Sequence, residues 1–294
     1  MSIINYIGNT PIVKIQNPYG ERLGQVYVKL EEFNPGGSHK ARVALQMVED
    51  AEVSGNLTEG SVILEATGGN TGIGLCIAAA LKGYKTVLVI PDTYSPQKIK
   101  MLQAYGAEVI LADHTLGNDC HIIKARELKE QNSNYFWVDQ LSNSANPKAH
   151  YYGTGKEIYN QMQGEIDYFV AGMGSGGTMT GVAKRLKELK PGVKTVAVQP
   201  QGCDLKNGIH VPHKIQGLAV GRLGKFVDFD LIDSFESVEY EEVMELRQWL
   251  IKKQGLSLGI SSGANILVAL KIAKKVDYYT KIVTVAPDNG ISYL

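Results

Sequence analysis

The sequence predicts an α/β protein of two domains, each a mostly parallel twisted sheet flanked by helices. Short apolar runs alternate along the chain with helix-forming segments, and several of these runs end in glycine-rich turns. Such runs, separated by helices of about ten residues or more, are typical of parallel sheets with right-handed crossovers. A chain of 294 residues is long enough for two modest domains.

The order of the elements follows from the same alternation. Buried strands are expected at 26–30, 61–64, 85–90, 107–112, 135–138, 168–171, 194–198 and 281–285. Helices are expected directly after Lys40, at 73–81, from Ser95-Pro96 to 102, around 127–129, at 182–186 and at 264–272. Domain edges are expected near residues 41 and 146.

Composition excludes several classes of function. Lys and Arg number 30, Asp and Glu also number 30, and no basic stripe points to nucleic acid. No apolar stretch approaches the roughly 20 residues of a membrane span, and the first residues lack the basic start of a signal peptide. Cys76, Cys120 and Cys203 lack metal-ligand spacing, so we expect a protein of the reducing cytoplasm with no metal site.

Lys40 is the most informative residue of the chain. It lies in Asn-Pro-Gly-Gly-Ser-His-Lys-Ala-Arg at 34–42, directly after the strand expected at 26–30. A glycine-rich turn between a strand and a helix can hold a lysine amine in a buried pocket, where it is able to form a Schiff base. Taken alone, the stretch is more readily explained as a loop lysine that adds solubility. Two further segments decide against that reading.

The first of these segments is the glycine-rich stretch 172–181, which follows an apolar strand and precedes a helix. Its glycines let consecutive N–H groups point at one spot beside a helix N-terminus, which favours an anion, and the Ser175 and Thr178 hydroxyls can add hydrogen bonds. Residues 172–177 also match a dinucleotide fingerprint, but the next strand ends in Gln199-Pro200 without the acid that binds a ribose. A monophosphate cup therefore fits better than NAD.

The second segment, Glu-Ala-Thr-Gly-Gly-Asn-Thr-Gly at 65–72, also lies between a strand and a helix. Its backbone donors and its Thr and Asn side chains suit a carboxylate plus one polar oxygen. On its own it is equally well explained as a tight turn between a strand and a helix.

Together the three segments resemble the cysteine synthase and cystathionine β-synthase family, which are fold type II pyridoxal-phosphate enzymes. The resemblance runs from Ile-Gly-Asn-Thr-Pro-Ile-Val at 7–13 to Pro287-Asp288. It implies a cofactor, pyridoxal 5'-phosphate, in the cleft between the two domains. It further implies that residues 1–40 cross back to join 146–294 in a larger domain that binds the cofactor phosphate, leaving 41–145 as a smaller, mobile domain.

The resemblance also implies a role for individual residues. Lys40 corresponds to the Schiff-base lysine and catalytic base, Asn70 to the partner of the cofactor's phenolic oxygen, and Ser261 to the partner of its pyridine nitrogen. The phosphate cup corresponds to Gly174, Ser175, Gly176, Gly177 and Thr178. The expected substrate site consists of Thr67, Gly68, Gly69, Thr71, Gln140 and Gly217. Local sequence alone also allows Ser261 to be the cap of the helix at 264–272, and the two roles can coexist.

Three departures from the family bear on specificity. Gly68 replaces a serine whose hydroxyl would meet the substrate, and His39 and Ala41 flank the lysine where the family has other residues. We expect His39 to lie on the outer face rather than to tune the cofactor phosphate. The loop 215–222 carries an unusual charge in Arg222, and three carboxylates follow it, Asp228, Asp230 and Asp233. Most of these charges are expected to be solvated, but one aimed inward would serve as general base for a water or thiol.

These residues predict an enzyme that performs β-replacement or β-elimination on a serine or cysteine derivative through an α-aminoacrylate. The leading hypothesis is a cysteine synthase that uses O-acetylserine and sulfide. The alternative is a lyase that consumes L-cysteine and releases sulfide, giving serine, lanthionine, cystathionine or pyruvate, and the three departures favour it more than the family alone would. By resemblance we expect a small amino-acid substrate, a homodimer and serine acetyltransferase as a possible partner. A non-catalytic scaffold that binds such a partner is the remote alternative.

Overall fold

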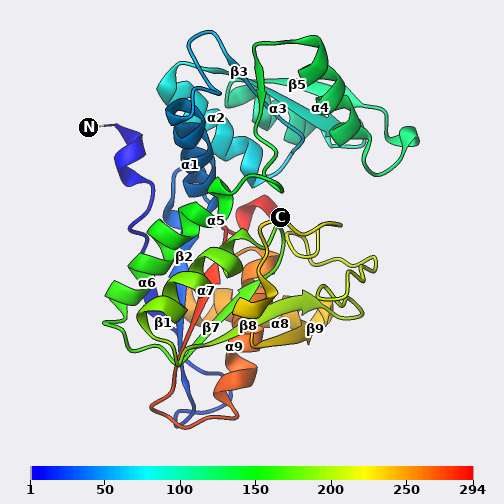
Figure 1. Cartoon of the computed structure of the whole chain (residues 1–294). Helices are drawn as coiled ribbons and strands as arrows, with labels where there is room; N and C mark the ends of the chain where they lie inside the picture. Colours follow the sequence, from blue (N-terminus) through cyan, green and yellow to red (C-terminus); the bar gives the residue numbers. More distant parts are fainter. Residues whose placement is uncertain (1, 294) are drawn as a thin grey trace.

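The structure is a computed structural model that describes residues 2–293. Its strands form two separate sheets, one of six strands and one of four. Figure 1 shows them as the centres of two lobes, with the C-terminal end of the chain lying between the lobes.

The six-stranded sheet has the order β1-β2-β10-β7-β8-β9. Its strands are β1 (Ile12–Lys14), β2 (Gln25–Leu30), β7 (Tyr168–Gly172), β8 (Lys194–Pro200), β9 (Ser234–Val238) and β10 (Lys281–Ala286). β1 pairs antiparallel with β2, and the other neighbouring pairs are parallel. The sequence analysis missed the edge strands β1 and β9, because both are short and largely half-buried and so lack the apolar run of a central strand.

The four-stranded sheet has the order β5-β4-β3-β6 and is parallel throughout. Its strands are β3 (Val62–Glu65), β4 (Lys85–Pro91), β5 (Ala107–Ala112) and β6 (Tyr135–Trp137). Each of them lies within one residue of the predicted position. β4 is the clearest case, since its inner residues are buried on both faces and its sequence is a continuous apolar run.

The helices divide between the two sheets. α1 (Lys40–Val53), α2 (Asn70–Lys82), α3 (Pro96–Ala104) and α4 (Cys120–Gln131) pack around the four-stranded sheet, whereas α6 (Lys156–Gln161), α7 (Gly177–Leu189), α8 (Tyr240–Gln254) and α9 (Ile260–Ala273) pack around the six-stranded one. α5 (Ala145–Ala149) contacts both α1 and α7, and a π-helical turn, η4 (His150–Gly155), joins it to α6. The short 3-10 turns are η1 (Ile3–Tyr6), η2 (Glu31–Phe33), η3 (His114–Leu116), η5 (Phe229–Leu231) and η6 (Ile291–Tyr293). None of the helices within residues 2–293 has both the length and the apolar character that a bilayer crossing requires.

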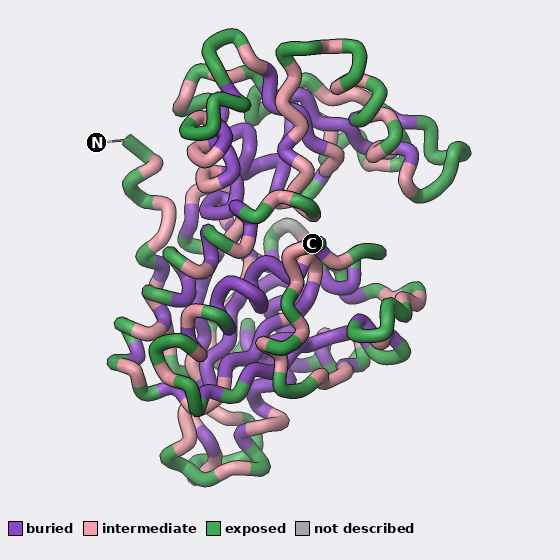
Figure 2. Tube along the Cα trace, in the orientation of Figure 1, coloured by how far each residue is buried: buried purple, intermediate pink, exposed green. Residues whose placement is uncertain are grey.

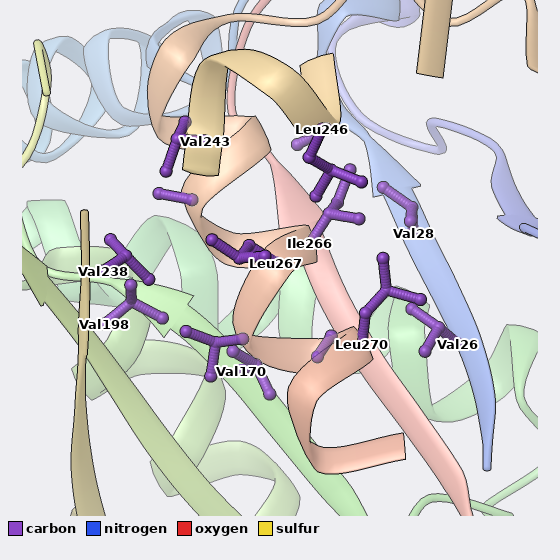
Figure 3. Packing of buried hydrophobic residues seen from close by; sticks show 14 of the residues in the cluster. Val26, Val28, Val170, Val198, Val238, Val243, Leu246, Ile266, Leu267 and Leu270 are labelled. Carbon is purple, nitrogen blue, oxygen red and sulfur yellow. The ribbon is translucent and has the colours of Figure 1, made fainter. Parts of the chain in front are cut away.

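Each sheet separates two apolar layers, because successive side chains of a strand point to opposite faces. In β7, Val170 faces the layer formed with α8 and α9, and its neighbour Phe169 faces the layer formed with α6 and α7. Figure 3 shows the first layer, in which Leu267 and Leu270 of α9 lie over the valines of β2, β7 and β8. Buried residues run through the interior of both lobes in Figure 2, so each sheet has its own core.

The carboxyl ends of the central strands of both sheets open toward the same space. β3 ends at Glu65, β7 at Gly172 and β10 at Ala286, and the turns that follow them line one cavity. Ligands of open parallel sheets bind at this edge. The fold therefore directs attention to the space between the two sheets.

Candidate active site

A cavity of about 930 Å³ lies between the two sheets. It is lined by the turns after β3, β4, β6, β7 and β10 and by the loop around 216–222. It brings together residues that are more than 200 positions apart in the chain. The cofactor and substrate residues expected from the sequence all line it: Lys40, Thr67, Gly68, Gly69, Asn70, Thr71, Gln140, Gly174, Ser175, Gly176, Gly177, Thr178, Gly217 and Ser261.

Lys40 is the first residue of α1 and reaches the cavity wall. The turn before it contains Gly36 and Gly37 with φ of +79° and +72°, a conformation that glycine adopts most readily. The turn is anchored to the large sheet, because the N–H of His39 donates to the carbonyl of the residue after β10 at 2.8 Å. Burial lowers the pKa of Lys40 to about 8, although the carboxylate of Asp288 opposes the shift. A substantial fraction of this amine is neutral near pH 7 to 8, so it can act as nucleophile and base.

The turn between β7 and α7 forms a cup at a helix N-terminus. Gly176 is the N-cap of α7 and has φ of +87°, and the first N–H groups of the helix have no partner within it. A Cβ on Gly177 would lie 2.0 Å from Oδ1 of the buried Asn146, so only glycine fits there. Asn146 in turn donates its Nδ2 to the hydroxyl of Ser175 at 3.3 Å. The unpaired N–H groups, the hydroxyls and the helix dipole together suit a phosphate.

Gly177→Ala is expected to weaken cofactor binding at least about tenfold, because the new methyl group must displace Asn146 and distort the cup. The measurement is the dissociation constant of pyridoxal phosphate by absorbance titration. Gly192→Ala is the matched control, because a Cβ at Gly192 meets no atom within 4 Å. Equal cofactor affinity of the two variants would contradict the assignment of the cup.

Ser261 lies in the first turn of α9 and is 4% exposed. Its hydroxyl makes no hydrogen bond to another side chain within residues 2–293, and it faces the cavity beside Gly217, whose Cβ would lie 3.4 Å from the Ser261 oxygen. α9 begins at Ile260 with Gly259 as its N-cap. The alternative that Ser261 caps a helix at 264–272 is therefore wrong, and the hydroxyl is left available to a ligand.

Asn70 opens α2 and reaches across the cleft to Asp288, which follows β10. Nδ2 of Asn70 donates to Oδ2 of Asp288 at 2.7 Å, and the Tyr293 hydroxyl donates to the same oxygen at 2.5 Å. Burial raises the pKa of Asp288 above its usual range. Its other oxygen, Oδ1, is buried without a hydrogen-bond partner in the described part of the chain. This oxygen lies against Gly259, where an added Cβ would come within 2.0 Å of it, so Asp288 acts here mainly by holding Asn70 at the cavity.

The turn before α2 and the loop after β6 meet at one wall of the cavity. The Thr71 hydroxyl donates to Oε1 of Gln140 at 2.8 Å, across 69 positions of sequence. The Thr67 hydroxyl accepts from the N–H of Gly69 at 3.4 Å. These groups surround the N-terminus of α2, where unpaired N–H groups favour a carboxylate. The structure thus brings together the residues expected to bind the substrate carboxylate.

The three carboxylates considered as a general base lie elsewhere. Asp228, Asp230 and Asp233 are exposed, and none lines the cavity. Asp233 accepts hydrogen bonds from Nζ of Lys187 and from the N–H of Thr195, and these bonds hold its carboxylate away from the cavity. Asp228 accepts from the N–H of Asp230 and so begins η5. The hypothesis that one of them points inward is not supported by the structure.

His39 does not lie on the outer face, as the sequence analysis expected, but lines the cavity. Its Nδ1 lies 3.2 Å from the Thr178 hydroxyl, which also lies 3.2 Å from Nε2 of the buried His150. Nδ1 of His150 is 3.0 Å from the Thr154 hydroxyl. Burial, together with the nearby Lys40, lowers the pKa of both histidines well below the usual value. The cup therefore rests on two neutral imidazoles.

Several residues of the site were missed by the sequence analysis. Glu65, at the end of β3, lines the cavity with Oε2 unpartnered, and burial raises its pKa to about 8. Its position at the carboxyl end of a predicted parallel strand was the available signal. Asp288 was noted only as part of the resemblance, and His150 carries no local signal because its partners are distant in sequence.

The donor set fits one class of cofactor. A buried lysine amine, a glycine cup at a helix N-terminus and an unbonded hydroxyl at a second helix start face one cavity. These groups match an aldehyde, a phosphate and a ring nitrogen. The fold and the site together define a pyridoxal-phosphate dependent enzyme.

Comparison with known proteins leads to the same conclusion. The profile of the family described as pyridoxal-phosphate dependent enzyme matches residues 3–288. The cysteine synthase of Staphylococcus aureus strain N315 is 43% identical over 295 residues, which span 100% of this chain and 95% of that protein. The chain belongs to the pyridoxal-phosphate dependent enzyme family.

Two solved structures illustrate the likeness in three dimensions. A hydrogen sulfide-producing enzyme from Fusobacterium nucleatum has a TM-score of 0.94 and 43% identity, covering 100% of this chain and 97% of its own. O-acetylserine sulfhydrylase isoform 3 from Entamoeba histolytica has a TM-score of 0.95 and 38% identity, covering 100% of this chain and 89% of its own. The predicted fold class, enzyme class and cofactor are confirmed.

Proposed function

We propose that this enzyme replaces the β-substituent of a serine or cysteine derivative, in the manner of a cysteine synthase. The single observation that carries the proposal is the meeting of Lys40 with the Thr71–Gln140 wall in one cavity. The proposed reaction requires an amine able to accept a proton and donors for an α-carboxylate that face one cavity. The related proteins named as cysteine synthase, sulfide-producing enzyme and O-acetylserine sulfhydrylase support the same reaction class.

Different residues would bind the substrate and the cofactor. Thr67, Thr71 and the N-terminus of α2 hold the substrate carboxylate, and Gln140 orients Thr71. The phosphate would be held by 174–178 and the ring nitrogen by Ser261. Asn70, fixed by Asp288, would hold the phenolic oxygen. When bound, the cofactor supplies an electron sink that labilises the Cα proton.

Lys40 moves the protons of the reaction. Its neutral amine takes the Cα proton, and the β-substituent then leaves with its electron pair. A nucleophile adds at Cβ, and the Lys40 ammonium returns a proton to Cα. Ser261 offers a neutral hydroxyl where an aspartate would keep the ring nitrogen protonated, which favours quick expulsion of the leaving group over transamination. The two buried histidines of the cup are neutral, so the phosphate would be held by N–H groups, hydroxyls and the helix dipole rather than by their charge.

The lowered pKa of Lys40 predicts the pH dependence of cofactor capture. Only the neutral amine attacks the cofactor aldehyde, and the neutral fraction rises as pH rises through about 8 instead of through about 10.4 for a solvated lysine. The rate at which cofactor-free protein takes up pyridoxal phosphate, followed by absorbance, should therefore rise from pH 6.5 and level off above about pH 8.5. A rate still climbing steeply at pH 10 would contradict a buried lysine.

The proposal leaves two directions to decide by experiment: synthesis of cysteine from O-acetylserine and sulfide, or breakdown of cysteine with release of sulfide. The test supplies cofactor-loaded protein either with L-cysteine alone or with O-acetylserine and sulfide, and measures sulfide and the amino-acid product. Quick formation of cysteine in the second mixture, with little sulfide in the first, supports a biosynthetic synthase. Rapid sulfide release from cysteine, with serine, lanthionine or pyruvate, supports the cysteine-consuming lyase. Failure of both mixtures would refute the proposed reaction.

Organisation beyond the single chain stays a prediction. We propose a homodimer, a small amino-acid substrate and an optional acetyltransferase partner, on the resemblance to cysteine synthases. On the same resemblance, the smaller unit, 41–145, is proposed to close over bound substrate, and the Asn70–Asp288 hydrogen bond is one contact between it and the larger unit. Light scattering of the purified protein, with and without serine acetyltransferase, tests the assembly. The expectation of a cytoplasmic protein likewise stays a prediction.

A further inference from the structure

Gly68 is covered by an aromatic ring. A Cβ on Gly68 would lie 2.2 Å from Cε1 of Tyr94 and 2.8 Å from its Cζ, so even alanine cannot fit unless the ring moves. Tyr94 lies in the turn between β4 and α3, and lines the cavity beside the Thr67–Thr71 turn. The missing side chain at 68 and the ring at 94 are thus two parts of one arrangement, which the sequence alone does not reveal.

Tyr94 presents an unused polar group to the cavity. Within residues 2–293 its hydroxyl makes no hydrogen bond, and the ring also lines the adjoining pocket formed with the loop 215–220. Burial raises the pKa of the phenol, so it stays protonated and can donate. Tyr94 therefore stands between the turn that holds the substrate carboxylate and the loop around Gly217.

Lys98 adds a positive charge to the same wall. It is the third residue of α3, and its Nζ lies 5.3 Å from the centroid of the Tyr94 ring, a cation–π contact. It forms no ion pair with a carboxylate in the described part of the chain, whereas Arg222, which also lines the cavity, is paired with Asp119. The wall therefore has one uncompensated cation beside one unused hydroxyl.

We propose, on the basis of the proposed function, that Tyr94 and Lys98 form the subsite for the nucleophile and select a thiol that carries a carboxylate. The Tyr94 hydroxyl and the Lys98 ammonium bind that carboxylate, and the ring seated on Gly68 sets the distance to the reacting carbon. The cavity volume of about 930 Å³ is near the upper end of the range of about 300–1,000 Å³ for ligand pockets, and the cofactor, the amino acid and the thiol would share it.

The reaction at this subsite balances without a further reactant. The bond from Cβ to the leaving group breaks and that group departs with the electron pair. The thiol sulfur forms the new bond to Cβ, its proton compensates the leaving group's charge, and Lys40 returns to Cα the proton it removed. The net change is thiol plus substituted alanine to thioether plus protonated leaving group, with no oxidation or reduction.

The test compares two thiols with cofactor-loaded enzyme and O-acetylserine. 3-Mercaptopropionate carries a carboxylate and 2-mercaptoethanol does not, and thioether formation is quantified by mass spectrometry. Wild-type enzyme should prefer the carboxylate thiol in kcat/KM. In Lys98→Met this preference should fall about three- to tenfold through KM, with the neutral thiol unchanged, since Lys98 is exposed and a charge pair with an exposed lysine contributes modestly. Lys100→Met, an exposed lysine of the same helix that does not line the cavity, is the matched control.

Two further variants test the part of Tyr94. Tyr94→Phe keeps the ring and removes the hydroxyl, so it should raise KM for the carboxylate thiol alone. Gly68→Ala should displace the ring and lower kcat/KM for the thiols. If Gly68→Ala also disturbs the cofactor absorbance, the double variant with Tyr94→Ala should restore the wild-type spectrum, because the clash is then removed.

The outcomes separate the two claims. Wild-type enzyme that forms cysteine from sulfide, but whose Lys98→Met variant shows the wild-type ratio between the two thiols, overturns the subsite and leaves the proposed function standing. An equal loss for both thiols also overturns it, because the effect would then be structural. Wild-type enzyme that gives no product with sulfide or with either thiol overturns the proposed function and the subsite together.

Discussion

Lys40→Ala is expected to lower kcat by at least about 10³-fold, since loss of a positioned general base alone contributes about 10²–10⁴-fold. The variant also loses its covalent hold on the cofactor, and we expect pyridoxal phosphate to dissociate on gel filtration. The structural reason is that Lys40 is the first residue of α1 and is fixed at the cavity wall by the preceding glycine turn. Turnover is measured as cysteine formation, and cofactor retention as absorbance of the eluted protein.

Lys124→Ala is the control for this experiment. Lys124 is a half-buried lysine of α4 that pairs with Glu127 at 3.1 Å and does not line the cavity, so its loss should leave turnover and cofactor content unchanged. An active Lys40→Ala variant with normal cofactor retention would show that another group holds the cofactor. The helix-start geometry of Lys40 would then need a different explanation.

Arg42→Ala is expected to lower the free energy of unfolding by about 3–5 kcal/mol, the usual result of removing one partner from a buried ion network. Arg42 is 6% exposed and pairs with the fully buried Glu31 at 2.6 Å and with Glu157 at 2.6 Å. Lys29, also fully buried, contacts Glu157 from the other side at 2.7 Å. The substitution leaves Glu31 without its cation directly behind the Lys40 turn. Urea denaturation measures the effect.

The same network predicts a pH dependence of that loss. Burial alone would raise the pKa of Glu157, but the hydrogen bonds and charges of Arg42 and Lys29 lower it to about 2. A carboxylate with a depressed folded-state pKa contributes stability above its unfolded pKa of about 4.3, and this contribution is lost as pH falls toward the folded value. The difference between wild type and Arg42→Ala should therefore shrink between about pH 4.5 and pH 2.

Lys148→Ala is the control for the network. Lys148 forms an exposed ion pair with Asp50 at 2.7 Å, so its loss should change stability by only about 0–1 kcal/mol. A loss of similar size in Arg42→Ala would show that the buried network contributes no more than a surface pair.

The central strands were predictable because burial on both faces favours consecutive apolar residues, as at 87–91 in β4 and 196–198 in β8. The edge strands β1 and β9 and the short helices α5 and α6 were not, because their sequences mix polar and apolar residues and their positions depend on neighbours. The start of α9 was predicted four residues too far along the chain, at 264 instead of at Ile260, for a related reason. Gly259 and two serines read as a loop, whereas they form the cap and first turn of a buried helix.

The glycine turns of the site were predictable because backbone geometry is encoded locally. Gly176 adopts a positive φ at the start of α7, and Gly177 contacts Asn146 so closely that no side chain fits. Contacts between separate turns were not predictable in this way. Tyr94 on Gly68 depends on how distant turns pack, and no local pattern encodes it.

The most direct measurement of the central claim is chemical fixation of the cofactor to its lysine. Cofactor-loaded protein is reduced with sodium borohydride and digested, and the modified peptide is identified by mass spectrometry. We predict that the pyridoxyl group is found on Lys40, the lysine whose burial lowers its pKa to about 8. A pyridoxyl group on Lys98, which lines the same cavity, or no modified peptide at all, would contradict the account.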